Sequence, residues 1–159
     1  MKKNKKILIA GPCSIENEIQ AMTLAHELGV LADKYNFDYV FKGSFDKANR
    51  TSVHSKRGIG LEEAIKVFNK IKTHIGCKTT TDVHETWQID KLEDVVDIIQ
   101  IPAFLCRQTD LLIEAGQTMN TVNIKKGQFV EGKSMIHPVN KVLSTGNKNI
   151  WLTERGSMF

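Results

Sequence analysis

Reactive side chains gather at six places in this chain of 159 residues, and each place directly follows a short apolar run. Arg and Lys recur in these clusters, together with Cys, Asp, His and Glu. Arg binds phosphate or carboxylate through two parallel N–H groups, and Lys binds it as a point charge, so the expected ligand is a small anion. In chain order the clusters are residues 11–16, 42–50, 82–85, 102–107, 125–126 and 154–155.

The cations in these clusters are too many for one phosphate group. A single Lys or Arg in a loop is usually a solvated residue, but a recurring set after successive apolar runs favours a shared ligand site. We therefore expect more than one anionic group to bind. The cations are Lys42, Lys47, Arg50, Arg107, Lys125 and Arg155.

The segments before and between the clusters predict alternating strands and helices. The apolar runs are short and rich in β-branched residues, which is typical of strands. The segments between them space apolar residues by three or four, which is typical of amphipathic helices. Predicted strands are residues 7–10, 39–41, 79–83, 96–101, 121–124 and 150–152; predicted helices are 19–28, 61–71, 87–96, 110–115 and 135–143, the last starting near Pro138.

This alternation indicates an α/β fold with parallel strands and right-handed crossovers. The candidates are a doubly wound open sheet and a (β/α)8 barrel, and in both the carboxyl ends of the strands open on one face. The clusters would then meet in one cationic mouth. A dinucleotide site is disfavoured, because Gly58 and Gly60 follow no predicted strand and no glycine-rich motif follows the first one.

Composition is typical of one globular domain and excludes several function classes. The net charge of +4 comes entirely from Lys2, Lys3, Lys5 and Lys6, so a broad nucleic-acid-binding face is not expected. The first apolar run is too short for a signal peptide, and nothing approaches the roughly 18 apolar residues of a membrane span. We expect no membrane partner.

The three cysteines, Cys13, Cys77 and Cys106, are odd in number and widely spaced. A disulfide scaffold is therefore excluded, and a reducing cytoplasm is expected. A lone cysteine such as Cys13 is by itself more often a small buried residue than a ligand. Of Asp82 and His84, we expect only one to face the site.

Six motifs, taken together, resemble the 3-deoxy-D-manno-octulosonate 8-phosphate synthases, in that family's order and spacing and over essentially the whole chain. Relatives that make the seven-carbon shikimate precursor carry a Lys-Pro-Arg-Thr type motif where this chain has KANR. The motifs are GPCSIE at 11–16, FKGSFDKANR at 41–50, TTDVHE at 80–85, IQIPAFLCRQTD at 99–110, VNIKKGQF at 122–129 and LTERG at 152–156.

The resemblance implies a TIM barrel and a cytoplasmic transferase of lipopolysaccharide biosynthesis, a homotetramer in this family. It condenses phosphoenolpyruvate with D-arabinose 5-phosphate and releases phosphate: carbon 3 of phosphoenolpyruvate attacks the sugar aldehyde, and water adds at carbon 2. The implied phosphoenolpyruvate-binding residues are Lys42, Ser44, Lys47, Gln100, Lys125 and Arg155, and the implied catalytic residues are Lys47, Asp82 and Lys125. The implied sugar-phosphate residues are Asn49, Arg50 and Thr51, with Arg107 reaching in from a neighbouring subunit.

The resemblance also implies a metal. One branch of the family has Cys at the position of Cys13 and binds a divalent metal, and a thiolate suits Zn²⁺ or Fe²⁺. Zn, Fe or Mn is expected, with Cys13 as one ligand and the other ligands beyond Phe159. We expect residues 1–159 to form a single partial TIM-barrel domain with about six of the eight βα units.

Two alternatives remain open from the sequence. The chain could be a non-catalytic, truncated remnant that binds phosphate compounds or co-assembles with intact subunits. It could also be a related phosphoenolpyruvate-dependent sugar-acid synthase that uses erythrose 4-phosphate or an amino sugar.

Overall fold

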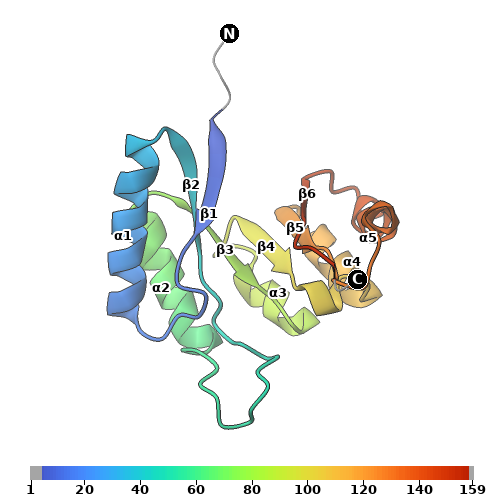
Figure 1. Ribbon diagram of the computed structural model, residues 1–159, viewed down its shortest axis with the longest axis horizontal. Helices are drawn as coiled ribbons and strands as arrows, with labels where there is room; N and C mark the ends of the chain where they lie inside the picture. The colour runs from blue at the N-terminus through green and yellow to red at the C-terminus, as the bar shows by residue number, and fades with distance from the viewer. Residues whose placement is uncertain (1–4, 158–159) are drawn as a thin grey trace. The chain divides into compact units, whose positions relative to one another are not determined.

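The computed structural model describes residues 5–157, which form two compact units divided between Thr81 and Asp82. Each unit contains parallel strands connected by helices (Figure 1). The α/β class with parallel strands, predicted from the alternation of short apolar runs and helical segments, is therefore confirmed.

The first unit is built on three parallel strands and two long helices. Ala10 lies opposite Phe41, and Lys42 lies opposite Thr80. Because the strands run parallel, the loops that follow them leave from the same edge. The elements are β1 (Lys6–Ala10), α1 (Glu18–Lys34), β2 (Phe37–Lys42), α2 (Leu61–His74) and β3 (Lys78–Asp82).

The core of the first unit follows from the pattern of α2. Its buried residues Ala64, Val67, Phe68 and Ile71 repeat at the spacing of one helical face. The Phe68 ring packs edge-on against Phe41 of β2, with ring centroids 6.2 Å apart. Helix α2 therefore covers one face of the strands.

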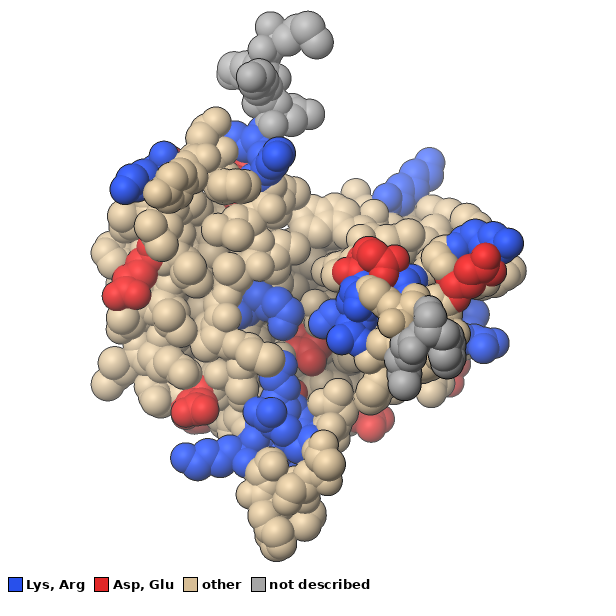
Figure 2. All heavy atoms as spheres, in the orientation of Figure 1, with Lys and Arg blue, Asp and Glu red and all other residues tan. Residues whose placement is uncertain are grey.

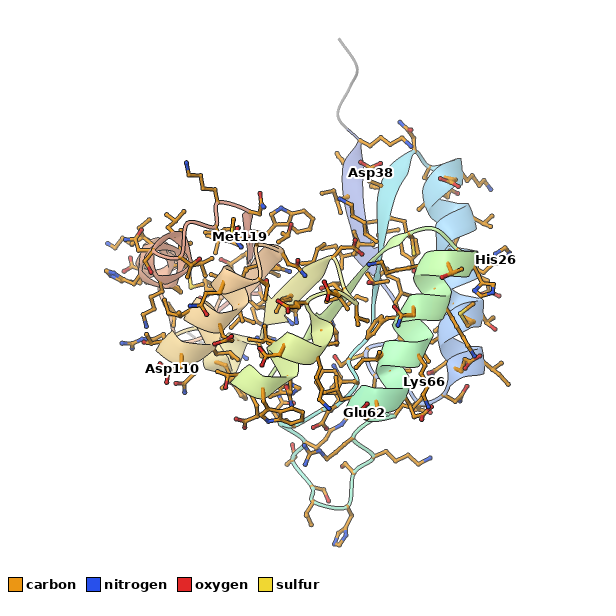
Figure 3. All side chains as sticks on the ribbon, turned by 180° about the vertical axis from the view of Figure 1, so that it is seen from behind. His26, Asp38, Glu62, Lys66, Asp110 and Met119 are labelled. Atoms are coloured by element: carbon orange, nitrogen blue, oxygen red, sulfur yellow. The ribbon has the colours of Figure 1, made fainter. Side chains whose placement is uncertain are left out.

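Helix α1 follows only in part the spacing that predicts it, in which Ile19, Met22, Ala25 and Leu28 share one face. The structure buries Ala21, Ala25 and Ala32, whereas Ile19 is 79% exposed. Small alanines allow a helix to pack closely, so the buried face is the alanine face rather than the face of the larger side chains. Figure 3 shows the outer side of this helix, where the exposed His26 lies.

The second unit repeats the architecture with shorter helices. Strand β4 pairs with β5 from Ile98 opposite Thr121, and β5 pairs with β6 up to Lys125 opposite Thr153. The elements are α3 (Thr86–Leu92), β4 (Ile98–Ile101), α4 (Thr109–Gln117), β5 (Thr121–Lys125), α5 (Ile136–Leu143) and β6 (Ile150–Thr153), with 3-10 turns at Ala103–Leu105 and Gly132–Met135.

Several predicted boundaries shift in the second unit. Helix α3 ends at Leu92 rather than at residue 96, because the amides of Val95 and Val96 both bond the Leu92 carbonyl in a turn. Helix α5 begins at Ile136, which puts Pro138 in the first turn, where no amide donor is needed. Within residues 5–157, no helix has the length and apolar character needed to cross a membrane.

Candidate functional site

In the first unit, the loops after β1 and β2 are joined beyond the ends of the strands. Ile15 N donates to Ser44 O at 3.0 Å, and residues 14 and 44 form a further parallel bridge. Gly11 allows this close approach, because a Cβ at that position would lie 2.0 Å from Lys42 O. The joined loops bring Cys13 next to the residues that follow β2.

A cationic group surrounds Cys13. Lys47 Nζ donates to the buried Ser44 Oγ at 2.7 Å. Burial raises the pKa of the Cys13 thiol, but a hydrogen bond from Lys47 and the charges of Lys47, Lys42 and Arg50 outweigh it, so the pKa lies below its ordinary value. Four sequence-predicted residues of the site, together with Cys13, therefore share one environment.

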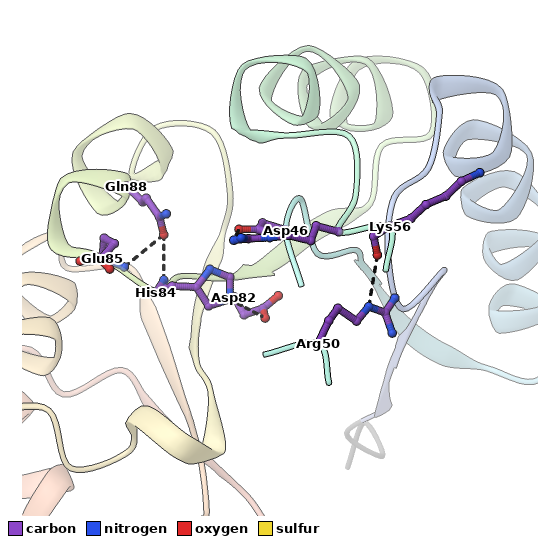
Figure 4. Close-up of polar contacts among 8 residues, drawn as sticks. Asp46, Arg50, Lys56, Asp82, His84, Glu85 and Gln88 are labelled. Atoms are coloured by element: carbon purple, nitrogen blue, oxygen red, sulfur yellow. Dashed lines mark hydrogen bonds and ion pairs between the residues drawn. The ribbon is translucent and has the colours of Figure 1, made fainter. Parts of the chain in front are cut away.

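The loop 46–58 extends this group and is fastened at its base. Arg57 binds both carboxylate oxygens of Asp46, and Lys47 N donates to Arg57 O at 2.6 Å. Arg50 Nε donates to Lys56 O at 3.3 Å (Figure 4). Figure 2 shows Lys and Arg side chains gathered over the loop that follows β2.

Asn49 and Thr51 are exposed on this loop, on either side of Arg50. A cavity of about 370 Å³ is lined by Arg50, with three cationic side chains in its wall. Such a cavity suits an anion. Its lining is Ser14, Glu16, Asn17, Arg50, Lys56, Arg57 and Gly58.

In the second unit, Asp82 and His84 face each other. His84 Nε2 lies 3.3 Å from Asp82 Oδ2, and the backbone N–H of His84 donates to Gln88 Oε1 at 2.8 Å (Figure 4). The expectation that only one of the pair faces the site assumed that the two side chains point to opposite faces. That assumption was wrong, because residues two apart lie on the same side of an extended chain. Val83 N donates to Gln100 O at 3.2 Å, which sets the pair beside β4.

Gln100, Lys125 and Arg155 occupy the ends of β4, β5 and β6. Gln100 is buried on β4, Lys125 is half-buried at the last position of β5, and Arg155 is exposed two residues after β6. Thr153 Oγ1 donates to Asn123 Oδ1 at 2.8 Å and ties β6 to β5. The second unit thus places these three predicted site residues near or beyond the carboxyl-terminal ends of three neighbouring parallel strands.

Arg107 lies apart from that group, between the 3-10 turn at Ala103–Leu105 and α4. Its side chain is exposed, and its carbonyl accepts from Lys141 Nζ at 2.8 Å. A cavity of about 550 Å³ adjoins it. The lining is Arg107, Phe129, Val130, Glu131, Ser134, Met135, His137, Pro138 and Lys141.

Cys13 is exposed rather than buried, so it does not follow the usual behaviour of a lone cysteine. A thiolate favoured by nearby cations is a soft donor suited to Zn²⁺ or Fe²⁺. However, no three His, Cys, Asp or Glu side chains within residues 5–157 lie close enough to hold a metal together. The described residues therefore offer such a metal one ligand, Cys13.

Two features of the site were not predicted from the sequence. Lys126 is buried and bonded to main-chain carbonyls, unlike its neighbour Lys125. Asp46 and Arg57 form an ion pair across eleven residues. The KK dipeptide was the only sequence signal for the role of Lys126, and no sequence signal indicated the pairing of Asp46 with Arg57.

Three curated relatives carry the name 2-dehydro-3-deoxyphosphooctonate aldolase. The proteins from Desulfatibacillum aliphaticivorans, Wolinella succinogenes and Geobacter sulfurreducens are 52%, 50% and 49% identical to this chain over 96% of its length. The chain spans 56%, 62% and 56% of their respective lengths. The sequence model of the DAHP synthetase I family matches residues 2–159. With that match over almost every residue, the chain belongs to the DAHP synthetase I family.

Proposed function

We propose that this chain supplies the substrate-binding loops of a 3-deoxy-D-manno-octulosonate 8-phosphate synthase, a transferase that condenses phosphoenolpyruvate with D-arabinose 5-phosphate. The observation that carries the proposal is the cationic group around Cys13, which consists of Lys42 together with Lys47 and Arg50 of the KANR segment. Relatives about half identical in sequence bear the aldolase name for the same eight-carbon phosphosugar acid. The product would enter lipopolysaccharide biosynthesis.

In the proposed reaction, carbon 3 of phosphoenolpyruvate forms a bond to the sugar aldehyde carbon, and the aldehyde oxygen takes a proton and becomes a hydroxyl. Water adds at carbon 2 and gives up one proton. The bond from carbon 2 to the phosphate oxygen then breaks, which leaves a ketone whose oxygen came from water and releases inorganic phosphate with the second proton. Lys47 and Lys125 stabilise negative charge on the reacting groups, and Asp82 beside His84 accepts a proton from the water. The proposed phosphoenolpyruvate ligands are Lys42, Ser44, Lys47, Gln100, Lys125 and Arg155.

The sugar phosphate is proposed to bind Asn49, Arg50 and Thr51. The exposure of these residues and the cationic cavity beside Arg50 support this assignment. Arg107 is proposed to reach the sugar phosphate of a second copy in a homotetramer, which its exposed side chain supports. Light scattering of the purified chain measures the oligomeric state.

The parallel strands support a (β/α)8 barrel as the complete architecture. Three cysteines that form no disulfide within residues 5–157 support a reducing cytoplasm as the compartment. Cys13 is proposed as one ligand of a divalent metal, Zn, Fe or Mn, because its lowered pKa favours the thiolate.

The test is phosphate release from phosphoenolpyruvate by the purified chain, with D-arabinose 5-phosphate or erythrose 4-phosphate as acceptor and with or without chelator. We expect release with the five-carbon sugar only, and its loss with chelator. Lys47→Met should abolish release, whereas Lys66→Met on the exposed face of α2 should not. Equal release with both sugars, or full activity of Lys47→Met, would contradict the proposal.

A further inference from the structure

The second unit holds a buried charge that the proposed reaction does not use. Lys126 is 5% exposed, and its ammonium group lies among backbone oxygens. Nζ donates to Gly127 O at 3.1 Å, to Val130 O at 3.1 Å and to Gly156 O at 2.9 Å, and it lies 3.3 Å from Ser157 Oγ. We refer to the three carbonyl oxygens as the carbonyl cage. An ammonium has three N–H donors, and the cage supplies an acceptor for each.

The carbonyl cage connects two loops that are distant in sequence. Gly127 and Val130 belong to the loop after β5, whereas Gly156 and Ser157 follow β6. Lys126 N also donates to Thr153 O at 2.9 Å and so extends the pairing of β5 with β6 by one more bond. One side chain therefore fastens together the segments that follow two neighbouring strands.

The exposed side chain of Glu154 also holds the segment that follows β6. Its Oε1 accepts from the amides of Arg155 at 2.8 Å and Gly156 at 2.7 Å and lies 3.6 Å from Lys126 Nζ. Gly156 has φ of +83°, a conformation that favours glycine. The backbone on both sides of Arg155 is thus held by the carbonyl cage and by Glu154.

We infer that Lys126 is a positioning residue, which fixes the backbone at Lys125 and Arg155 so that both cations meet the same phosphoenolpyruvate. This inference rests on the proposed function. A buried ammonium is stabilised only while its partners surround it, so the carbonyl cage favours one arrangement of the two loops. Lys126 does not itself bind substrate, because its N–H donors are directed at the cage.

The first test measures amide hydrogen exchange in the full chain. In Lys126→Met the cage loses its donor, and exchange of the Arg155 and Gly156 amides should accelerate at least about tenfold. Glu154→Ala should accelerate exchange of the same two amides, because it removes their acceptor. Since Glu154 is exposed, this variant can be used if Lys126→Met does not fold. The matched control is Lys133→Met, which removes an exposed ammonium group that pairs with Glu131. Unchanged exchange at Arg155 and Gly156 in a folded Lys126→Met would overturn the inference, as would unchanged exchange in Glu154→Ala if Lys126→Met does not fold.

The second test measures affinity by calorimetry. In Lys126→Met, Kd for phosphoenolpyruvate should rise about tenfold, while Kd for arabinose 5-phosphate, whose proposed ligands Asn49, Arg50 and Thr51 are in the first unit, should not change. A general loss of folding would weaken the binding of both ligands equally, and that result would overturn the positioning role. Faster exchange with unchanged affinity for phosphoenolpyruvate would also overturn it. If the unaltered chain does not bind phosphoenolpyruvate, the proposed function is wrong, and so is the positioning role that rests on it. The exchange measurement would still show separately whether the cage holds the two loops together.

Discussion

At the scale of single residues, side chains of the same type in this chain have opposite environments. Lys125 is half-buried at the end of β5, whereas Lys126 is enclosed by backbone oxygens. Cys13 is exposed beside cations, whereas Cys106 is buried. The chemistry available to each residue therefore depends on what surrounds it rather than on its type.

The lowered pKa of Cys13 predicts a reactive thiol. Because Lys47, Lys42 and Arg50 stabilise the thiolate, iodoacetamide at pH 7.5 with chelator present should modify Cys13 faster than Cys77 or Cys106. Lys47→Met should raise the Cys13 pKa and slow the reaction several-fold. Peptide mass spectrometry measures the rate at each cysteine, with Lys66→Met as the control, and an unchanged rate in Lys47→Met would contradict the assigned cause.

The hydrogen bonds of Glu154 predict a lowered pKa for its carboxyl group. The amide of Gly156 is the largest cause lowering its carboxyl pKa, followed by the amide of Arg155 and the charge of Lys126, so the midpoint should lie below the ordinary value of 4.5. A lowered folded-state pKa stabilises the fold above pH 4.5, and this contribution is lost as pH falls through the folded-state midpoint. Carbon NMR of the Glu154 carboxyl group measures the titration midpoint. Lys126→Met should move this midpoint part of the way back toward 4.5. A midpoint at or above 4.5 in the unaltered chain would refute this account.

At the scale of elements, the connection between β2 and α2 is unusually long for a compact α/β unit, and such loops are commonly functional. It contains no helix or strand of the described structure between residues 43 and 60. Instead, the pair of Asp46 and Arg57 and the bond from Lys47 N to Arg57 O close it at its base. The closed loop presents Arg50 beside a cationic cavity.

Loss of the ion pair between Asp46 and Arg57 should make the loop more accessible to a protease. In Arg57→Ala, trypsin cleavage after Arg50 and Lys56 should accelerate roughly two- to fivefold, the range expected for loss of one surface ion pair. Mass spectrometry of the fragments measures the rates, and inorganic phosphate should slow cleavage more in the unaltered chain than in the variant. Lys66→Ala removes an exposed ion pair on α2 and is the control. Equal cleavage rates in both variants would show that the pair does not hold the loop.

At the scale of the whole molecule, each compact unit has a buried core of its own. Phe41, Phe68 and Ile71 are fully buried in the first unit, and Ile99 and Leu112 are fully buried in the second. The loops that carry the predicted ligand residues are built on these cores. Substitutions in a core should therefore change stability, and substitutions on an exposed face should not.

Phe68→Ala should lower the free energy of unfolding by about 3–5 kcal/mol, because it removes a buried ring and leaves a cavity against Phe41. Urea unfolding followed by far-ultraviolet circular dichroism measures this loss. Ile19→Ala on α1 is the matched control, since the 79% exposed side chain should change stability by less than about 0.5 kcal/mol. Similar losses in the two variants would contradict the assigned core.

The sequence by itself determined the alternation of strands and helices, because hydrophobic spacing is a local property that can be read along the chain. It also indicated where the reactive clusters lie, since they directly follow the apolar runs, and the motifs indicated the family. Boundaries were less certain: α3 stops at Leu92 because of a local turn, and α1 buries its alanines rather than Ile19.

Only the tertiary structure decided which reactive residues have which partners. The pairing of Asp46 with Arg57, the approach of Lys47 to Cys13 and the cage around Lys126 each join residues that are far apart in sequence. Lys125 and Lys126 are the same residue type at successive positions, and no local pattern separates the half-buried cation from the enclosed one. Burial and hydrogen bonding depend on the segments that fold against a side chain, so its role emerges only when those segments meet.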